Sequence, residues 1–212
     1  MHLRMDALSA AERYKLLAGT VVPRPIAWVS TLSAAGVGNV APYSFFNMIA
    51  SAPPLVVLGA MRGANGGLKD TATNILETKE FVVNLVSEPM LEAMNLTCVD
   101  APPEIDEAAL AGLEMLPSEL IAPPRIAGAP VSLECRLYQA IDAPPGSTII
   151  LGEVVAMTID ERFVDAATLR PDPVAMQLMG RVHGVGGYTR IRTDRTLARP
   201  VYEAPPAARG GA

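Results

Sequence analysis

The chain has 212 residues, of which 50% are hydrophobic and 18% charged, with a net charge of −5 and a mean hydropathy of +0.28. This length fits one domain, which we expect to span residues 1–202, followed by a disordered tail at 203–212 that is rich in proline, alanine and glycine. The negative charge and the lack of a basic run exclude nucleic acid as the main partner, and no apolar run reaches the ~18 residues of a membrane span.

The rest of the composition predicts a cytoplasmic protein without a metal centre. The N-terminus lacks the apolar segment of a signal peptide. The two histidines exclude a multi-histidine site, and Cys98 and Cys135 lack the spacing of metal ligands. The high apolar fraction indicates that part of the surface is covered at a subunit interface.

The first elements are a helix and a stiff extended arm. Ser9-Ala-Ala-Glu12 is a capping box and predicts a helix to about Leu17. Pro23-Arg24-Pro25 then forces extended backbone. Arg24 is therefore held on a rigid segment, where it is either a solvated surface residue or an anion contact.

A hairpin follows, with strands at 26–32 and 40–49 and a turn at 33–39. Trp28 is expected in the core or an interface, and Phe45 and Phe46 point to opposite faces of a strand. Four polar residues lie inside these apolar runs, and their partners are either the sheet itself or a ligand with many acceptors. They are Ser30, Thr31, Ser44 and Asn47.

The next segments suggest an anion site. Residues 55–58 form an apolar strand, and the glycine-rich loop 61–70 leads into a helix that Asp70 or Thr71 can cap and that ends at about residue 78. Free backbone N–H groups and the helix dipole attract anions at such a start, and Lys69 adds a positive charge. The loop lacks the spacing of a Walker motif.

The remaining elements favour an antiparallel barrel. A strand at 81–86 is followed by a helix at 87–97, and 100–130 is a surface excursion with a solvated acidic face. Residues 131–141 alternate as a half-buried strand, and 148–159 return as another. Helices long enough for parallel crossovers are missing from this half. The acidic face consists of Glu104, Asp106 and Glu107.

Glycines mark three further points. Gly152 is expected at a bulge or a close approach. A short turn of helix is expected at 174–179, and the glycine-rich segment 180–191 carries Arg181, His183 and Tyr188. Such glycine density is typical of a mobile segment or of close approach to a flat group.

Five segments, in this order, resemble the flavin reductase-like FMN-binding split-barrel family, and its flavoredoxin-like branch in particular. They are Arg24-Pro-Ile-Ala-Trp-Val-Ser-Thr31, Asn39-Val-Ala-Pro-Tyr-Ser-Phe-Phe-Asn47, Lys69-Asp-Thr71 with Asn74, Phe81-Val-Val-Asn84 and Gly152-Glu-Val154. The resemblance implies a six-stranded antiparallel split β-barrel with Greek-key connections, a homodimer, non-covalent FMN near the subunit interface, and reduction of flavin by NAD(P)H.

The resemblance also implies roles for residues. Residues 29–31 are expected along the isoalloxazine and ribityl chain, 44–47 at the ribityl chain and phosphate, and 69–71 at the phosphate. His183 and Tyr188 are expected near the flavin as possible catalytic residues. The full set expected to bind the cofactor is Arg24, Trp28, Val29, Ser30, Thr31, Ser44, Phe45, Phe46, Asn47, Lys69, Asp70, Thr71 and His183.

One departure leaves two functions open. Reductase partners of two-component monooxygenases carry Gly-Asp-His where this chain has Gly146-Ser147-Thr148. The first hypothesis is an NAD(P)H-dependent oxidoreductase whose bound FMN passes electrons to free flavin, a metal complex or a protein acceptor. The alternative is a flavoredoxin-like electron carrier that is reduced by a partner protein. A barrel for haem or pyridoxal phosphate, with His183 as the haem ligand, is a third reading.

Overall fold

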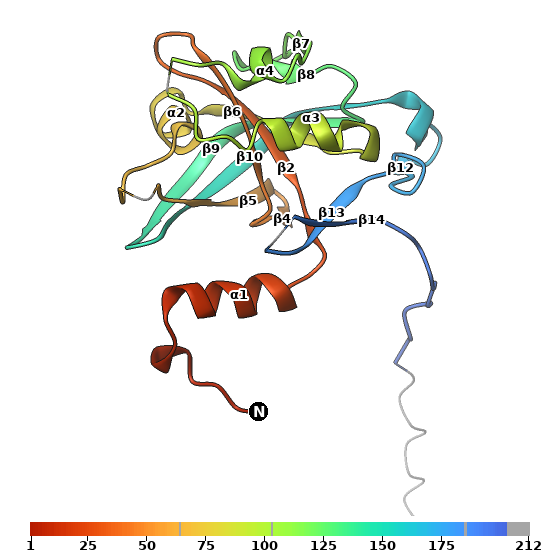
Figure 1. The fold of residues 1–212 in the computed structure, drawn as a ribbon. Helices are drawn as coiled ribbons and strands as arrows, with labels where there is room; N and C mark the ends of the chain where they lie inside the picture. The colour runs from red at the N-terminus through yellow and green to blue at the C-terminus, as the bar shows by residue number, and fades with distance from the viewer. Residues whose placement is uncertain (64, 103, 185, 203–212) are drawn as a thin grey trace, which may run out of the picture.

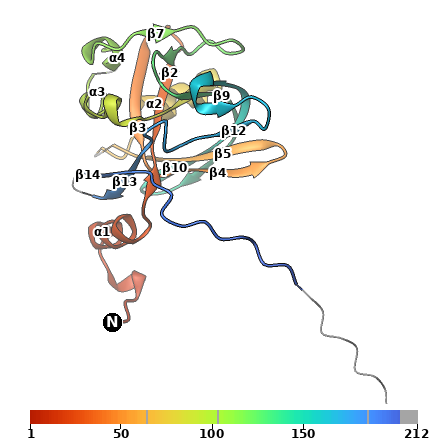
Figure 2. The ribbon, with the colours of Figure 1, turned by 90° about the vertical axis from the view of Figure 1, so that its right-hand side faces the viewer.

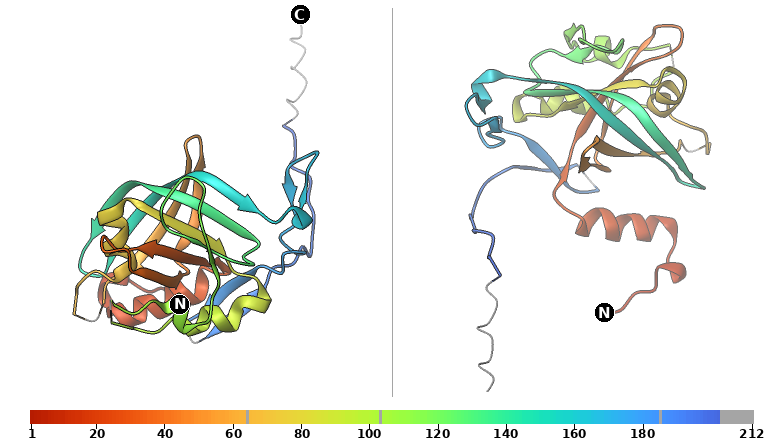
Figure 3. Two further views of the ribbon diagram at one scale, coloured as in Figure 1. Left: turned by 90° about the horizontal axis from the view of Figure 1, so that it is seen from above. Right: turned by 180° about the vertical axis from the view of Figure 1, so that it is seen from behind.

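The centre of the fold is one antiparallel sheet that curls around a hydrophobic core, with the helices at its periphery (Figures 1 and 3). The structure is a computed structural model, and it describes residues 1–63, 65–102, 104–184 and 186–202; the expected tail at 203–212 lies outside them. The sheet order is β3-β2-β6-β9-β10-β5-β4. Its strands are β2 (Ala27–Leu32), β3 (Gly38–Tyr43), β4 (Phe46–Ser51), β5 (Pro54–Met61), β6 (Glu80–Leu85), β9 (Val131–Ala143) and β10 (Ser147–Ile159).

The sheet has seven strands rather than the expected six, because the single strand predicted at 40–49 is two. β3 pairs with β2 and β4 pairs with β5, so these two strands are the opposite edges of the sheet. The chain passes between the edges through Ser44 and Phe45. Gly59 on β5 donates its N–H to the Phe45 carbonyl at 2.7 Å, and a Cβ on Gly59 would lie 3.0 Å from that of Phe45. Glycine therefore permits the close approach.

Strand β2 is buried on both faces, which explains its apolar sequence. Ala27 and Val29 belong to a cluster that α2 (Asp70–Thr78) covers, whereas Trp28 belongs to a second cluster on the other face. The indole N–H of Trp28 donates at 2.9 Å to Oγ1 of Thr97, the residue that follows α3 (Leu91–Leu96). A buried strand with both faces covered needs partners for its polar groups, and it has them.

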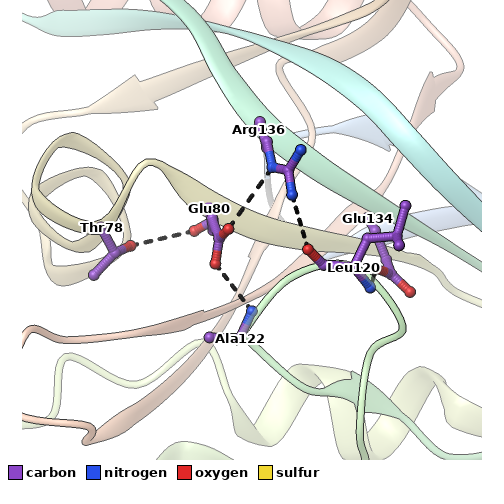
Figure 4. A network of polar contacts seen from close by, with 6 residues as sticks. All are labelled: Thr78, Glu80, Leu120, Ala122, Glu134 and Arg136. Atoms are coloured by element: carbon purple, nitrogen blue, oxygen red, sulfur yellow. Dashed lines mark hydrogen bonds and ion pairs between the residues drawn. The ribbon is translucent and has the colours of Figure 1, made fainter.

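A strap of residues 118–126 covers the outer face of β9 (Figure 4). The backbone N–H groups of residues 119–120 donate to the two carboxyl oxygens of Glu134, each at 2.8 Å. The N–H of Ala122 donates to Glu80 at 2.9 Å, and Arg136 donates to a strap carbonyl at 2.9 Å. The prediction of a half-buried β9 is therefore wrong at Ser132 and Glu134: the strap covers Glu134, and the buried Ser132 hydroxyl donates to Asn84 on β6 at 2.8 Å.

The helices largely follow their expected starts. In α1 (Ala10–Thr20) the capping box is formed, since Glu12 N–H donates to Ser9 Oγ at 3.3 Å and Ser9 N–H donates to the Glu12 carboxyl at 2.8 Å. Helix α2 (Asp70–Thr78) has Lys69 as its N-cap, one residue before the earlier of the two expected caps, Asp70. Residues 174–179 form turns and the start of a strand instead of a helix.

Helix α1 lies outside the barrel, below a small second sheet (Figures 1 and 2). That sheet has the order β1-β13-β14, so the glycine-rich segment is a hairpin paired with the extended arm. In the described residues no helix is long and apolar enough to cross a membrane. The remaining elements are η1 (Met5–Ala7), β1 (Arg24–Pro25), η2 (Glu88–Met90), α3 (Leu91–Leu96), α4 (Glu107–Leu110), β7 (Met115–Leu116), β8 (Arg125–Ile126), η3 (Glu161–Phe163), β11 (Val164–Asp165), β12 (Arg170–Pro171), β13 (Met179–His183) and β14 (Gly187–Arg190).

Candidate functional site

A cleft of about 790 Å³ opens between edge strand β3 and the N-terminus of α2. Its walls come from the loop that follows β5, the segment 97–101 after α3, residue Glu107 of α4, and Tyr14 of α1. Ligand sites in proteins commonly have volumes of about 300–1,000 Å³. The cleft is therefore large enough for a cofactor-sized molecule.

Buried amides and hydroxyls fix the floor of the cleft. Asn39 on β3 donates to Thr31 Oγ1 at 3.1 Å and to Thr71 Oγ1 at 2.8 Å. Asn74 on α2 donates to the same Thr31 oxygen at 3.0 Å. Thr31 is 1% exposed and lies beneath the cleft, so it joins strand β2 to the helix start instead of lining the cleft.

The start of α2 presents polar groups to the cleft. Lys69, Asp70 and Thr71 line it, and the first N–H groups of a helix have no partner within the helix. Lys69 Nζ lies 2.8 Å from a carboxyl oxygen of Asp100 across the cleft. This end of the cleft can attract an anion, because the helix dipole and the lysine act together.

Arg62 is the second cation of the cleft. Its guanidinium pairs with Asp142 at 2.5 Å and donates to the Gly66 carbonyl at 3.2 Å. Its Nε is buried and makes no hydrogen bond to any of the described residues. A buried donor without a partner is costly, so this atom is a candidate ligand contact.

Edge strand β3 supplies acceptors. The Val40 N–H donates to a side chain rather than to β2, so Val40 and Ser30 form a non-hydrogen-bonded pair. In an antiparallel pair every second residue is of this kind and points its backbone groups away from the partner strand. Pro42, two residues after Val40, therefore points its carbonyl to the open edge of the sheet, where it lines the cleft. Next to it, burial raises the pKa of Tyr43 to about 12, so its phenol is neutral.

The group that receives the Val40 N–H is Glu107, at 3.2 Å. Glu107 is 5% exposed, so the prediction that it belongs to a solvated acidic face is wrong. Asp106 caps α4 by accepting the Ala108 N–H at 2.9 Å, and this places Glu107 against β3. Burial raises the pKa of the Glu107 carboxyl, and Asp70 and Asp106 raise it further.

Of the other expected site residues, some line the cleft and some are buried in the sheet. Ser44 and Phe45 line the cleft. Trp28, Val29 and Ser30 are fully buried, and the Ser30 hydroxyl donates to the Pro124 carbonyl at 2.5 Å. The strap and Asn84 of β6, which donates to Ser30 Oγ at 3.3 Å, thus satisfy the Ser30 hydroxyl.

Arg24 supports the cleft from behind. It donates to the carbonyls of Ala18 and Val21 at the C-terminal end of α1, at 2.5 and 3.0 Å. Its Nε donates to Ser44 Oγ at 3.3 Å. Arg24 is 7% exposed, so it is not a solvated surface residue, and it positions Ser44 and α1.

Four expected residues lie away from the cleft lining. Phe46 packs against the core cluster, and Asn47 is exposed on β4. His183 is exposed on β13. Tyr188 accepts a hydrogen bond from Arg181 at 2.5 Å, and the guanidinium stacks over its ring at 4.7 Å.

Sequence reasoning missed Asn39, Tyr43, Arg62 and Glu107 as cleft residues. Asn39 and Tyr43 belong to a segment that carried the family resemblance, so that segment contained the signal for both. Arg62 sits in the glycine-rich loop beside Lys69, where a second cation near the helix start was a usable signal. Nothing local distinguishes Glu107 from an exposed acid.

Comparison with known proteins agrees with this architecture. A 2-nitrobenzoate 2-nitroreductase from Pseudomonas fluorescens is 38% identical, covers 98% of this chain and 100% of its own, and gives a TM-score of 0.85. Component B of a nitrilotriacetate monooxygenase from Bacillus cereus is 32% identical to this chain and has a TM-score of 0.88. The match covers 93% of this chain and 98% of the component B chain. A flavoredoxin from Desulfovibrio vulgaris shares the fold at 20% identity and has a TM-score of 0.73. The match covers 94% of this chain and 97% of the flavoredoxin chain.

A family model identifies the domain to which the chain belongs. The model of the flavin reductase like domain matches residues 18–173, which include the barrel strands and the start of α2. This one continuous match covers the antiparallel barrel and all the cleft residues except Tyr14. The protein therefore belongs to the flavin reductase like domain family.

Proposed function

We propose that the cleft binds FMN and that the protein is an NAD(P)H-dependent flavin oxidoreductase. One observation supports this most strongly: the same cleft combines a helix N-terminus bearing Lys69 with aromatic walls from Tyr14, Tyr43 and Phe45. A phosphate suits the first feature, and a flat ring suits the second. The names of the nitroreductase and monooxygenase relatives agree with flavin-linked redox chemistry.

The residues of the cleft fit such a ligand. Lys69 and Thr71 would hold the phosphate, and the Ser44 hydroxyl would contact the ribityl chain. The Nε of Arg62 has no hydrogen-bond partner among the described residues, so it could donate to a ligand. Carbonyls at the β3 edge would accept from ring N–H groups.

The chain's own contribution is binding and orientation. Bound FMN would supply the two-electron chemistry, taking a hydride from a reduced nicotinamide and passing the electrons to free flavin, a metal complex or a protein acceptor. The Thr31, Asn39 and Asn74 network keeps the floor rigid. No acid–base pair is required, since positioning supplies the main effect.

We also propose a homodimer. Edge strand β4 exposes apolar side chains, with Met48 65% and Ile49 50% exposed, and Leu17 on α1 is 54% exposed. An exposed apolar edge strand is a pairing surface. Size-exclusion chromatography with light scattering should give twice the 22.3 kDa chain mass, and Met48→Glu should shift the protein to the monomer. A monomeric wild type would contradict this part.

An electron carrier reduced by a partner protein is the second candidate. Thr148 stands where reductase partners of monooxygenases carry histidine, and it is 4% exposed on β10. A buried threonine there offers no imidazole to a nicotinamide. The two candidates share the FMN site and differ in the electron donor.

A spectrum and an anaerobic titration separate these functions. We expect a flavin absorption spectrum after reconstitution with FMN and bleaching by stoichiometric NADH or NADPH. Flavin that binds but resists both donors would support the carrier. A protein that binds no flavin would refute both.

Variants test the assigned phosphate contact. Lys69→Gln removes a charge-assisted contact worth roughly 1.5–3 kcal/mol, so FMN affinity should fall about tenfold or more. Riboflavin, which has no phosphate, should bind the variant and the wild type equally. Lys15→Gln on exposed α1 is the matched control. Equal FMN affinity in Lys69→Gln would remove Lys69 from the site.

A further inference from the structure

Glu107 is a buried acid at the wall of the cleft that the proposed function does not use. It is the first residue of α4, is 5% exposed, and lines the cleft. One carboxyl oxygen accepts the Val40 N–H from edge strand β3 at 3.2 Å.

The groups that face Glu107 are acidic or neutral. Asp106 lies beside it on α4, Asp70 faces it from the start of α2, and neutral Tyr43 lies on β3. Within the described ranges neither Asp70 nor Glu107 forms an ion pair. The charges of this part of the cleft are therefore uncompensated.

The cations of the cleft do not neutralise these acids. Arg62 pairs with Asp142 at 2.5 Å, and Lys69 pairs with Asp100 at 2.8 Å. A phosphate at the start of α2 is thus attracted by the helix and Lys69 and repelled by the two unpaired acids. In a partly buried cleft this repulsion is screened less than at the surface.

We propose that Glu107 is a specificity-determining carboxylate that weakens the hold of the cleft on phosphorylated ligands, so that FMN exchanges instead of staying permanently bound. This inference rests on the proposed function. Glu107 would discriminate between ligands with and without a phosphate through its negative charge, and it would take no part in electron transfer. An exchangeable FMN could leave the cleft after reduction and carry its electrons to an acceptor.

Glu107→Gln tests the proposal with little structural change, because the amide oxygen can still accept the Val40 N–H. FMN affinity, measured by quenching of flavin fluorescence at fixed ionic strength, should rise about fivefold or more, a typical size for coupling between two groups. Riboflavin affinity should stay the same. Glu104→Gln removes an equal charge from an exposed position nearby and should change neither affinity.

A pH series gives a second readout. At low pH Glu107 is protonated in the wild type, so wild type and Glu107→Gln should bind FMN equally. As the pH rises through the pKa of Glu107, which burial raises, the wild type should lose FMN affinity relative to the variant. The phosphate of FMN also titrates, with a pKa near 6, and this affects both proteins alike.

The outcomes separate the inference from the proposed function. A wild type that binds neither FMN nor riboflavin overturns both. A wild type that binds FMN, with a Glu107→Gln variant of the same FMN-to-riboflavin affinity ratio at every pH, overturns the inference alone. Weaker FMN binding by a folded Glu107→Gln also overturns it, since Glu107 would then be a favourable contact.

Discussion

Replacing Gly152 by alanine should destabilise the barrel through one defined clash. A Cβ at this position would lie 2.4 Å from Phe81 Cζ and 3.0 Å from its Cε1. Phe81 is fully buried on β6, so its ring cannot move without disturbing the core. Overpacking of this kind costs about 1–3 kcal/mol, while alanine offsets up to about 1 kcal/mol by restricting the unfolded chain.

Thermal unfolding followed by circular dichroism measures the effect. A chain of this length loses about 2–4 °C in Tm per kcal/mol, so Gly152→Ala should lower the Tm by several degrees. Gly146→Ala is the matched control, because no heavy atom lies within 4 Å of its Cβ position. Leucine at position 81 has no ring to meet the new Cβ. In the Phe81→Leu background, Gly152→Ala should therefore lower the Tm much less than it does in the wild type. An unchanged Tm in Gly152→Ala, or the same loss in both backgrounds, would refute the clash.

Three further predictions concern the strap, α1 and a cleft phenol. Glu134→Gln leaves one of the two N–H donors of residues 119–120 without its carboxylate acceptor, so stability should fall by about 1–3 kcal/mol and these amides should exchange faster with deuterium; unchanged exchange would contradict the anchoring role. Ser9→Ala removes the capping box and should speed amide exchange in α1, where Ala18 is the buried residue, with little change in global Tm; a large fall in Tm would show that α1 unfolds with the barrel. Burial raises the pKa of Tyr43 to about 12 from 10.0, so the native state keeps a proton that the unfolded chain loses, and stability falls as pH rises from 10 to 12. Tyr43→Phe should show a smaller loss over this range in urea unfolding; an equal loss would contradict the shifted pKa.

Local patterns in the sequence were enough for several elements. The capping box at Ser9 predicted the start of α1, alternation predicted the long strand β9, and 148–159 was correctly expected to return as the next strand, β10. Gly152 was expected at a bulge or a close approach, and both are present. These features depend on neighbours a few residues apart, so the sequence alone carries them.

The boundary between β3 and β4 was not visible in the same way. Residues 40–49 have strand-forming side chains throughout, yet the strand breaks at Ser44 and Phe45. The break exists because β3 pairs with β2 and β4 pairs with β5 at the opposite edge. Strand propensity does not encode which partner a strand takes.

The residues alone were enough to predict the family, the antiparallel barrel and a helix that starts next to Lys69. Tertiary structure alone decided that Thr31 lies beneath the cleft, that a strap buries Glu134, and that Glu107 turns inward. The Val40 N–H that holds Glu107 is 67 positions away in the chain. An acid is exposed or buried according to what packs over it, and contacts over such distances come from the fold and not from local pattern.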